Sequence, residues 1–337
     1  MRTSFLYIIT MKWIEAVPNV SEGKNPIILN ALTDCLRTAP NVQLLGMDAN
    51  PSANRTVFTL AGQPNAVCNL LFDFISLATR LIDMRTQRGA HPRLGAVDVC
   101  PLVPLQEISL QETAQLAQSL GKRVGEELQI PVYLYEAAAA RAACNNLAFI
   151  RRGEYENLAE KLHRLPPDFG PADFNEPVQK TGACVIGARN FLIAFNINLN
   201  TRDAQIAKQI AARLRESGGG LKGVKAIGWY MENFGRAQVS CNITDYHAAP
   251  LHLVFETCQN HASALGVQAT GCELVGLIPL EAILTAGKHY ASAEENPAAL
   301  IQAARKGLNL EEVKPFDSAE QILEFKAQPN NQKTLFY

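Results

Sequence analysis

One order of predicted elements occurs twice along the chain, and it constrains the fold more than any other feature of the sequence. Hydrophobic periodicity predicts a strand, a helix, two strands, a helix and a strand in the first hundred residues. These six elements are expected at residues 13–17, 26–36, 42–47, 56–61, 65–84 and 96–103. Asn25 and Pro26 begin the first helix as an N-cap followed by proline, and the turn-rich segment 48–54 separates the middle strands.

The same order returns after residue 183. Its elements are expected at 191–199, 203–217, 224–230, 237–243, 250–265 and 271–278. Pro101 to Leu105 resembles Gly276 to Leu280, and Asn19 corresponds to Asn196, both about 175 residues further along. This repetition predicts an α+β fold of duplicated ferredoxin-like (βαββαβ) α/β sandwiches. Two unrelated α+β regions that share an order by chance are the alternative.

The segment between the two runs predicts the domain organisation. Ser109 and Glu112 form a capping box that begins a helix, and Pro131 to Tyr135 predicts a strand that can extend the first sheet. Residues 164–182 contain several prolines and little periodicity, which indicates a domain boundary within a long loop. We therefore expect four segments: an N-terminal extension at 1–11, subdomains at 12–182 and 183–315, and a tail at 316–337.

Charge, cysteine content and missing motifs exclude several classes of protein. Lys and Arg number 31 and Asp and Glu 32, so the basic excess of a dedicated nucleic-acid binder is missing. None of the eight cysteines forms a CxxC pair, and most lie in apolar runs, which indicates buried reduced thiols in a cytoplasmic protein. The apolar stretch Phe5 to Ile9 is too short for a signal peptide or a membrane span, and Met11 is an alternative start. We find no P-loop, nucleophile elbow, HExxH or clustered metal set, and expect no nucleotide, metal or membrane.

Histidine side chains are the natural candidates for acid–base chemistry near neutral pH, and one of the six stands apart. His91 lies in a short loop between a long helix and a buried strand. The arginines nearby are Arg85, Arg88 and Arg93. Because guanidinium groups bind carboxylates, the loop suits an anionic substrate such as an amino dicarboxylate. The positive charges should lower the pKa of His91, and Asp98, if near, would oppose that. A solvated arginine-rich loop explains the same residues equally well.

Two further groups of polar residues are candidate ligand contacts. Asp48, Asn54 and Arg55 bracket the turn-rich segment and can present a carboxylate, an amide and a guanidinium to a ligand. A helix cap and an ordinary salt bridge explain them equally well. Asn196 and Asn198 alternate with apolar residues, so they share one sheet face, which either reads a heteroaromatic edge or is the wet side of the sheet.

Several motifs, in the right order, resemble the glutamate formimidoyltransferase family, which includes the N-terminal part of the formiminotransferase-cyclodeaminases. The motifs are Val17–Gly23, Asn54–Val57, Arg80–Met84, His91–Arg93 with Gly95–Pro101, Pro131–Tyr135, Gly153–Tyr155, Gly187–Arg189 with Phe191–Leu199, and Gly228–Tyr230. The resemblance covers residues 12 to 315. It implies two ferredoxin-like subdomains with a cleft between them, assembled as a homodimer.

The resemblance also implies an activity and its site. The expected reaction is transfer of the formimino group from N-formimino-L-glutamate to N5 of tetrahydrofolate, yielding 5-formiminotetrahydrofolate and L-glutamate, in histidine degradation. The catalytic histidine of the family maps onto His91, as general acid and base. Its folate loop maps onto 170–182, with contacts expected from Gly170, Pro171, Ala172, Asp173, Phe174 and Gly182. Substrate contacts are expected from Asp48, Asn54, Arg55, Arg88, Arg93, Arg189, Asn196 and Asn198.

Departures from the family pattern concern the folate rather than the reaction. The folate loop has Val178 to Lys180 where an aromatic residue is common, with Phe174 as the substitute stacking partner. The chain ends at Tyr337 without a cyclodeaminase domain, so we expect a separate protein to release ammonia. Two alternatives stay open: a related folate enzyme that uses a formyl donor, and a non-catalytic module that binds an amino acid or a folate.

Overall fold

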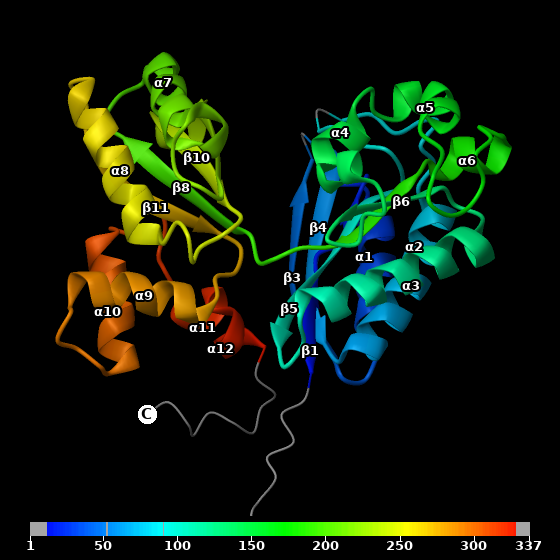
Figure 1. Cartoon of the computed structure of the whole chain (residues 1–337), viewed down its shortest axis with the longest axis horizontal. Coiled ribbons are helices and arrows are strands. Elements are labelled where there is room, and N and C mark those ends of the chain that lie inside the picture. The colour runs from blue at the N-terminus through cyan, green and yellow to red at the C-terminus, as the bar shows by residue number, and fades with distance from the viewer. Residues whose placement is uncertain (1–11, 52, 90, 328–337) are drawn as a thin grey trace, which may run out of the picture. The chain divides into compact units, whose positions relative to one another are not determined.

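A computed structural model describes residues 12–51, 53–89 and 91–327. The expected extension at 1–11, with its apolar stretch and Met11, and the end of the expected tail from 328 lie outside these residues. The chain divides between Asn190 and Phe191 into two compact units, called here unit 1 and unit 2, each built on its own sheet (Figure 1). The fold is therefore mixed α+β with two sheets.

Unit 1 is built on a seven-stranded sheet. Its strands are β1 (Trp13–Ala16), β2 (Asn19–Val20), β3 (Val42–Asn50), β4 (Arg55–Gly62), β5 (Val97–Gln106), β6 (Val132–Glu136) and β7 (Cys184–Ala188). Successive strands β1 and β2 both lie between β4 and β5, and β3 pairs with the other edge of β4, all antiparallel. Strand β7 lies between β5 and β6 and runs parallel to both. Strands β6 and β7 are thus joined in one sheet although the segment 137–183 separates them in the sequence.

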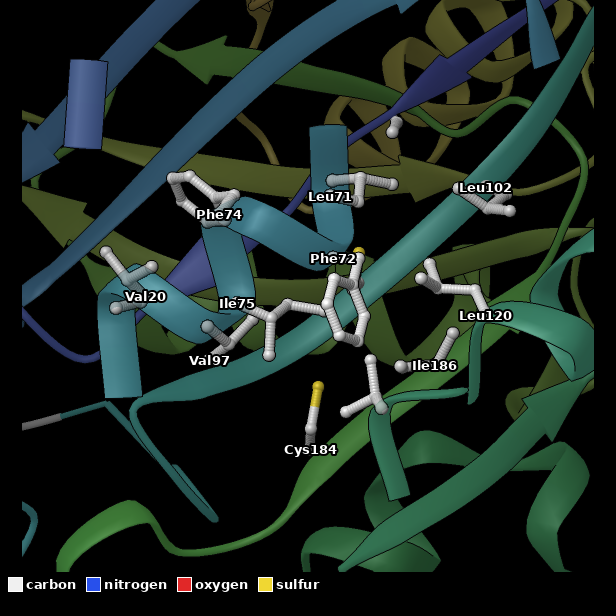
Figure 2. Packing of buried hydrophobic residues seen from close by; sticks show 14 of the residues in the cluster. Val20, Leu71, Phe72, Phe74, Ile75, Val97, Leu102, Leu120, Cys184 and Ile186 are labelled. Atoms are coloured by element: carbon white, nitrogen blue, oxygen red, sulfur yellow. The ribbon is translucent and has the colours of Figure 1, made fainter. Parts of the chain in front are cut away.

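Three long helices cover one face of this sheet. They are α1 (Pro26–Leu36), α2 (Pro64–Leu81) and α3 (Leu110–Leu128). Their apolar faces pack on the strands in a hydrophobic core (Figure 2). Phe58 and Phe74 form an edge-to-face contact in this core, with ring centroids 5.4 Å apart. The predicted helix starts are confirmed: the Asn25 side chain accepts from two backbone N–H groups of α1, and Ser109 forms the capping box of α3.

Short elements from residues 142–181 form a second, smaller core in unit 1. They are η1 (Ala142–Asn145), α4 (Leu147–Arg151), η2 (Tyr155–Asn157), α5 (Leu158–Arg164) and α6 (Glu176–Thr181). Their apolar side chains pack around Tyr133, Tyr135 and Val185. Since these residues alternate with those facing the long helices, this core lies on the opposite sheet face.

Unit 2 contains a four-stranded antiparallel sheet in the order β11-β8-β10-β9. Its first elements are β8 (Ile193–Leu199), α7 (Ala204–Leu214), η3 (Glu216–Gly218), β9 (Val224–Met231), η4 (Glu232–Phe234), β10 (Arg236–Ile243), α8 (Leu251–Ala264) and β11 (Ala269–Val275). Helices α7 and α8 pack against its strands. The unit continues with α9 (Leu280–Tyr290), α10 (Pro297–Gly307), α11 (Ser318–Gln321) and α12 (Leu323–Lys326).

The six-element order predicted for each half is present, with differences at three places. Strand β3 continues to Asn50, so the turn before β4 is shorter than expected. The loop expected at 164–182 contains helix α6. Strand β7, which was not predicted, adds residues 184–188 to the sheet of unit 1. The four strands of the six-element order, numbered 1 to 4 along the chain with β1 and β2 counted as one, lie in the spatial order 2-3-1-4 in both units. In unit 1, β7 and β6 extend the sheet beyond strand 4.

Candidate functional site

His91 occupies the loop between α2 and β5, and its ring is held in one tautomer. Nδ1 lies 2.7 Å from the carbonyl oxygen of Pro92. Because a carbonyl oxygen can only accept, Nδ1 carries the proton and the lone pair of Nε2 is available. Within the part of the chain that the structure describes, no hydrogen bond is formed to Nε2. The half-buried ring is therefore oriented to accept a proton at Nε2.

The surroundings of His91 favour its neutral form. Burial, followed by the Arg55 guanidinium, lowers the pKa of His91, and Arg151 adds to this. The hydrogen bond to Pro92 and the carboxylate of Asp98 oppose the shift. The direction agrees with the prediction, but the arginines responsible are distant in sequence. A neutral base at neutral pH is the consequence.

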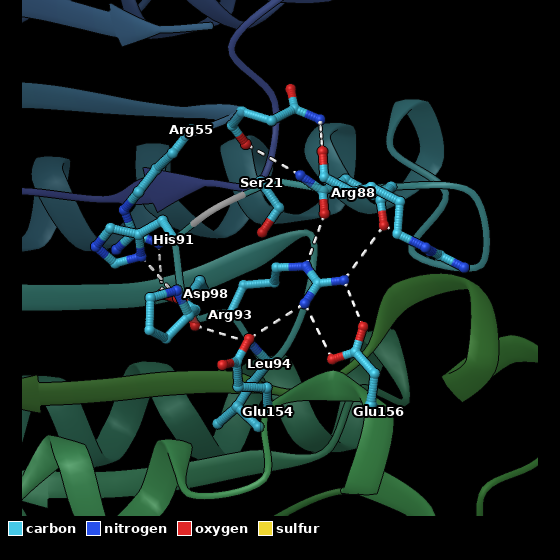
Figure 3. A network of polar contacts seen from close by, with 12 residues as sticks. Ser21, Arg55, Arg88, His91, Arg93, Leu94, Asp98, Glu154 and Glu156 are labelled. Carbon is cyan, nitrogen blue, oxygen red and sulfur yellow. Dashed lines mark hydrogen bonds and ion pairs between the residues drawn. The ribbon is translucent and has the colours of Figure 1, made fainter. Parts of the chain in front are cut away.

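Asp98, on β5, is fully buried and lies near His91 and Arg55 (Figure 3). Its Oδ2 atom accepts from Nη1 of Arg55 at 2.6 Å and also from Nη2 of Arg151. Its Oδ1 atom accepts from the backbone N–H of Leu94 at 2.9 Å, which fixes the loop that carries His91. Burial alone would raise the pKa of Asp98, but the Arg151 and Arg55 guanidiniums hold it below its ordinary value. Asp98 is therefore an anion that positions two cations.

Arg93 connects the His91 loop to the segment after α4. Its Nε donates to Gln87 Oε1 at 2.8 Å, and its Nη1 and Nη2 pair with Glu154 and Glu156 (Figure 3). Its carbonyl oxygen accepts from the backbone N–H of Tyr155. Each nitrogen of this buried guanidinium thus already has a protein partner. Arg93 ties the motif 153–155 to the loop.

Asn54 connects three loops around His91. Its Oδ1 atom accepts from the backbone N–H of Gly23 at 3.0 Å, and its Nδ2 donates to the carbonyl of Arg88 at 2.7 Å. A Cβ atom on Gly23 would lie 2.5 Å from Asn50 O, and one on Gly89 would lie 2.2 Å from Ala53 O. Only glycine permits this approach, so the loops form one rigid cluster. Arg88 in turn donates to carbonyl groups of its own loop.

The end of the predicted folate loop, residues 170–182, docks on the loop that carries His91. Backbone bonds join Met84 N–H to the carbonyl of Lys180, Ala96 N–H to that of Thr181, and Ala183 N–H to that of Leu94. Gly182 has φ +66°, and a Cβ there would lie 2.3 Å from Leu94 O. The structure therefore brings 180–183 next to the His91 loop.

The start of this loop is fixed near the C-terminal end of α3. Gly170, with φ +84°, approaches Ile130 so closely that a Cβ would lie 2.2 Å from its carbonyl oxygen. Phe174 packs at a tilt against Tyr155, with ring centroids 6.1 Å apart. Pro171, Ala172 and Asp173 are partly or fully exposed between these anchors.

Two predicted substrate contacts lie elsewhere on unit 1. Asp48 is exposed on β3, paired with Val57 of β4. Arg189 follows β7 and donates to the carbonyl of Asn190. Its charge acts on Glu15 of β1, a buried carboxyl whose pKa is raised by burial to about 7 in spite of Arg189. These two residues are not part of the cluster around His91.

Asn196 and Asn198 of unit 2 belong to a polar network on their sheet. Asn198 Nδ2 donates to Glu312 Oε2 at 2.9 Å, and Asn198 Oδ1 accepts from Gln238 at 2.9 Å. Asn196 Nδ2 lies 3.4 Å from Glu273 Oε2. Both amides are buried, so this face is not the wet side of the sheet.

Sequence reasoning missed Arg151 altogether and did not count Asp98, Asn19 or Gln87 among the site residues. Arg151 is 53 positions from its partner Asp98, and no motif or spacing relates the two. Asn19 accepts from Nε of Arg55 at 3.1 Å and so orients that guanidinium. The motif Val17–Gly23 was the one local signal that pointed to Asn19.

The cysteines of the chain are reduced, and the described residues contain neither a metal-binding group nor a helix that could span a membrane. The eight cysteines are free thiols and six are buried, including Cys100, as predicted. Among residues 12–51, 53–89 and 91–327 no three His, Cys, Asp or Glu side chains are grouped to hold a metal ion. In the same ranges no helix combines the length and apolar character of a bilayer span.

Fold and site together define a class: a two-unit α+β protein with an oriented neutral histidine among buried guanidinium groups. Family models then assign the chain more narrowly. The model for the formiminotransferase domain, N-terminal subdomain, matches residues 13–189, and the model for the formiminotransferase domain matches 194–328. The chain belongs to the formiminotransferase family.

Named relatives agree with this assignment. "Glutamate formimidoyltransferase" of Thermoplasma acidophilum is 41% identical over 83% of this chain and 92% of its own length. The protein of that name from Streptococcus pyogenes is 39% identical over 84% and 95%. "Formimidoyltransferase-cyclodeaminase" of Rattus norvegicus is 43% identical over 93% of this chain, which spans 59% of the rat protein. Among solved structures, the periplasmic protease PqqL from Escherichia coli matches 94% of this chain and 39% of its own, with 10% identity and a TM-score of 0.19.

Proposed function

We propose that this chain is a glutamate formimidoyltransferase, which moves the formimino group of N-formimino-L-glutamate to N5 of tetrahydrofolate, in histidine degradation. The observation that carries the proposal is the geometry of His91, whose Nδ1 is anchored on Pro92 while Nε2 is available beside two guanidinium groups. It is supported by relatives of that name, of which the chain covers 92% and 95%.

The chemistry needs one group that both accepts and donates a proton. N5 of tetrahydrofolate attacks the amidine carbon, and the N5 proton leaves to Nε2 of His91. The bond from that carbon to the glutamate nitrogen then breaks, and the same proton passes to the departing nitrogen to give L-glutamate. A histidine that is neutral before attack performs both steps, a contribution of about 10²–10⁴ in rate.

We propose that tetrahydrofolate binds along the segment 170–182 with contacts from Gly170, Pro171, Ala172, Asp173, Phe174 and Gly182. Support comes from the backbone bonds between Lys180–Ala183 and the His91 loop, which bring the end of this segment close to the acid–base group. The packing of Phe174 on Tyr155 gives the segment one aromatic anchor.

Two further proposals concern architecture. The two units are copies of one ferredoxin-like sandwich, for which the shared 2-3-1-4 strand order and the positions of Asn19 and Asn196 on the first strand region of each unit are the support. A homodimer is proposed from the family resemblance. Sedimentation analysis of the purified protein tests it, and a single monomeric species would contradict it.

Purified protein is incubated with tetrahydrofolate and either N-formimino-L-glutamate or N-formyl-L-glutamate, and the folate product is followed by absorbance and mass. We expect the 5-formimino product from the first donor at a rate far above the second. Preference for the formyl donor would establish the related formyl-transfer enzyme. Tight binding of either substrate without any product would establish a binding module instead.

A further inference from the structure

Two buried arginines beside His91 share a single carboxylate. Arg55 and Arg151 both pair with Oδ2 of Asp98, and the exposed fractions of their side chains are 8% and 16%. Asp98 itself is not exposed. The cluster therefore holds one positive charge in excess, in a place where water provides little screening.

Several donors of the two guanidiniums are unused. Arg55 donates through Nε to Asn19 and through Nη1 to Asp98, which leaves Nη2 without a partner among the described residues. Arg151 donates to Asp98 through Nη2, and its buried Nε forms no hydrogen bond. In a protein interior such donors cost stability unless a ligand satisfies them. The excess charge and the free N–H groups both fit an anion.

We propose that Arg55 and Arg151, held together by Asp98, bind the α-carboxylate of the N-formimino-L-glutamate donor next to His91. This inference rests on the proposed function. Arginine is suited to the role because its planar guanidinium forms two parallel hydrogen bonds to a carboxylate.

The position beside His91 selects the α-carboxylate among those that the two substrates carry. His91 must reach the nitrogen that leaves, and the α-carboxylate is attached to the carbon that bears this nitrogen. The γ-carboxylate is two methylene groups further away. The glutamyl carboxylates of the folate are separated from N5 by the aminobenzoyl group.

Asp98 is the positioning residue of this site. It does not touch the donor; it fixes both guanidiniums and, through Leu94 N–H, the loop that carries His91. A carboxylate bound by the two guanidiniums would give two anions for two cations. The α-carboxylate of the donor would thus neutralise the excess positive charge of Arg55, Arg151 and Asp98.

The test compares N-formimino-L-glutamate with two truncated donors. The N-formimino derivative of 4-aminobutyrate lacks the α-carboxylate, and that of 2-aminobutyrate lacks the γ-carboxylate. The variants are Arg151→Gln, Arg151→Lys and, as the matched control, Arg164→Gln. Arg164 is also paired with a carboxylate in unit 1, but it is exposed and remote from the cluster.

For the wild-type chain we expect loss of the α-carboxylate to lower kcat/KM more than loss of the γ-carboxylate. Arg151→Gln should lower kcat/KM for the natural donor about 10- to 100-fold and hardly change it for the 4-aminobutyrate derivative. Arg151→Lys should fall between Gln and wild type, and Arg164→Gln should match wild type. An equal loss for both donors in Arg151→Gln would overturn the proposal, since it would indicate a structural role.

Product binding gives a readout independent of turnover. L-Glutamate should bind the wild-type protein, and Arg151→Gln should raise its Kd at least about tenfold, measured by calorimetry. Arg164→Gln should leave that Kd unchanged. An unchanged Kd in folded Arg151→Gln would overturn the assignment of the α-carboxylate. A wild-type chain that transfers nothing from N-formimino-L-glutamate would refute the proposed function itself, and is recognised before any variant is made.

Discussion

Each unit buries a network of charged and amide side chains on its sheet, but the two networks are balanced differently. In unit 1, two arginines share Asp98, and some of their N–H groups have no partner within the part of the chain that the structure describes. In unit 2, two cations meet two anions: Arg236 pairs with Glu312, and Lys314 pairs with Glu273 at 3.1 Å. The two cations and two anions of the unit 2 network balance, whereas the group formed by Arg55, Arg151 and Asp98 has one positive charge in excess.

Amide side chains of unit 2 hydrogen-bond to its charged groups and to one another. Asn198 lies between Glu312 and Gln238, and Gln238 also accepts from Trp229 Nε1 at 2.9 Å. The register places Gln238 opposite both Asn198 and Trp229, so one row of side chains crosses three strands. Such a satisfied network specifies the packing of its own unit.

Comparison of the two networks helps to distinguish polar residues of a functional site from polar residues with a structural role. Buried polar residues alone do not indicate function, because both units have them. Unpaired buried atoms alone do not either, since among the described residues unit 2 has them at Arg215, His252 and Tyr290. The combination in unit 1 is more specific, because unpaired arginine donors there lie beside an uncompensated charge and an oriented histidine. We therefore expect the chemistry in the unit that contains His91.

The largest effect is expected from His91→Asn, which keeps a donor toward the carbonyl of Pro92 but cannot accept a proton. The rate of formimino transfer should fall by about 10²–10⁴ with little change in Tm. Because the pKa of His91 is lowered, the acidic limb of kcat/KM in the wild-type chain should lie below the ordinary range of histidine. Turnover within tenfold of wild type would show that His91 is not the acid–base group.

Structural features that depend on neighbouring residues were predictable from the sequence, whereas features that depend on residues far apart in the sequence were not. Asn25-Pro26 and Ser109-Glu112 are local signals, so the helix starts were predicted correctly. Strand β7 was missed because a short apolar run in a parallel sheet has no alternation, and its partner β5 lies far away in sequence.

The site shows the same division. The loop around His91 was recognisable from its histidine, proline and arginines, yet Arg93 is used by Glu154 and Glu156. The arginines that act on His91, Arg55 and Arg151, are brought together only by the folded sheet. Sequence spacing carries no information about such pairs.

The next effect concerns the buried carboxyl of Glu15 in unit 1. Glu273 in unit 2 pairs with Lys314, whereas Glu15 forms no ion pair within the described residues. Burial raises the pKa of Glu15 to about 7 against the opposing effect of Arg189. Since the folded value lies above the unfolded one, the protein should lose stability as pH rises from about 4.5 through 7. Glu15→Gln should remove this slope and gain roughly 3 kcal/mol relative to wild type between pH 4 and pH 8, measured by urea unfolding.

Glu112→Gln is the matched control, because its carboxylate has the opposite shift. Hydrogen bonds from Lys12 and from Ser109 lower the pKa of Glu112 to about 2. The stability that this carboxylate contributes is complete above about pH 4.5 and is lost as pH falls toward 2, so Glu112→Gln should be less stable than wild type at pH 8 and approach it near pH 2. The same sign for both variants would contradict the burial of Glu15 as the cause.

Glu312→Gln tests whether the paired charges of the unit 2 network have a structural role. The variant leaves Arg236 without its anion while it keeps an oxygen for Asn198, so we expect a destabilisation of about 1–3 kcal/mol with KM for both substrates unchanged. Glu311→Gln, which opens an exposed pair with Arg305, should cost less than about 1 kcal/mol. A large rise in KM without loss of stability would favour Asn196 and Asn198 as substrate contacts.

The smallest effects come from a matched pair of helix caps, one in each unit. Asn25 caps α1 and Asn296 caps α10, each with proline next and each accepting from two backbone N–H groups. Asn25→Ala and Asn296→Ala should each cost about 1 kcal/mol, with formimino transfer unchanged. Because each unit has its own sheet and core, hydrogen exchange should quicken only in the unit that carries the substitution. Faster exchange in both units from either variant would mean that the two units unfold together as one cooperative body. The difference between their polar networks would then affect a single free energy of unfolding rather than one for each unit.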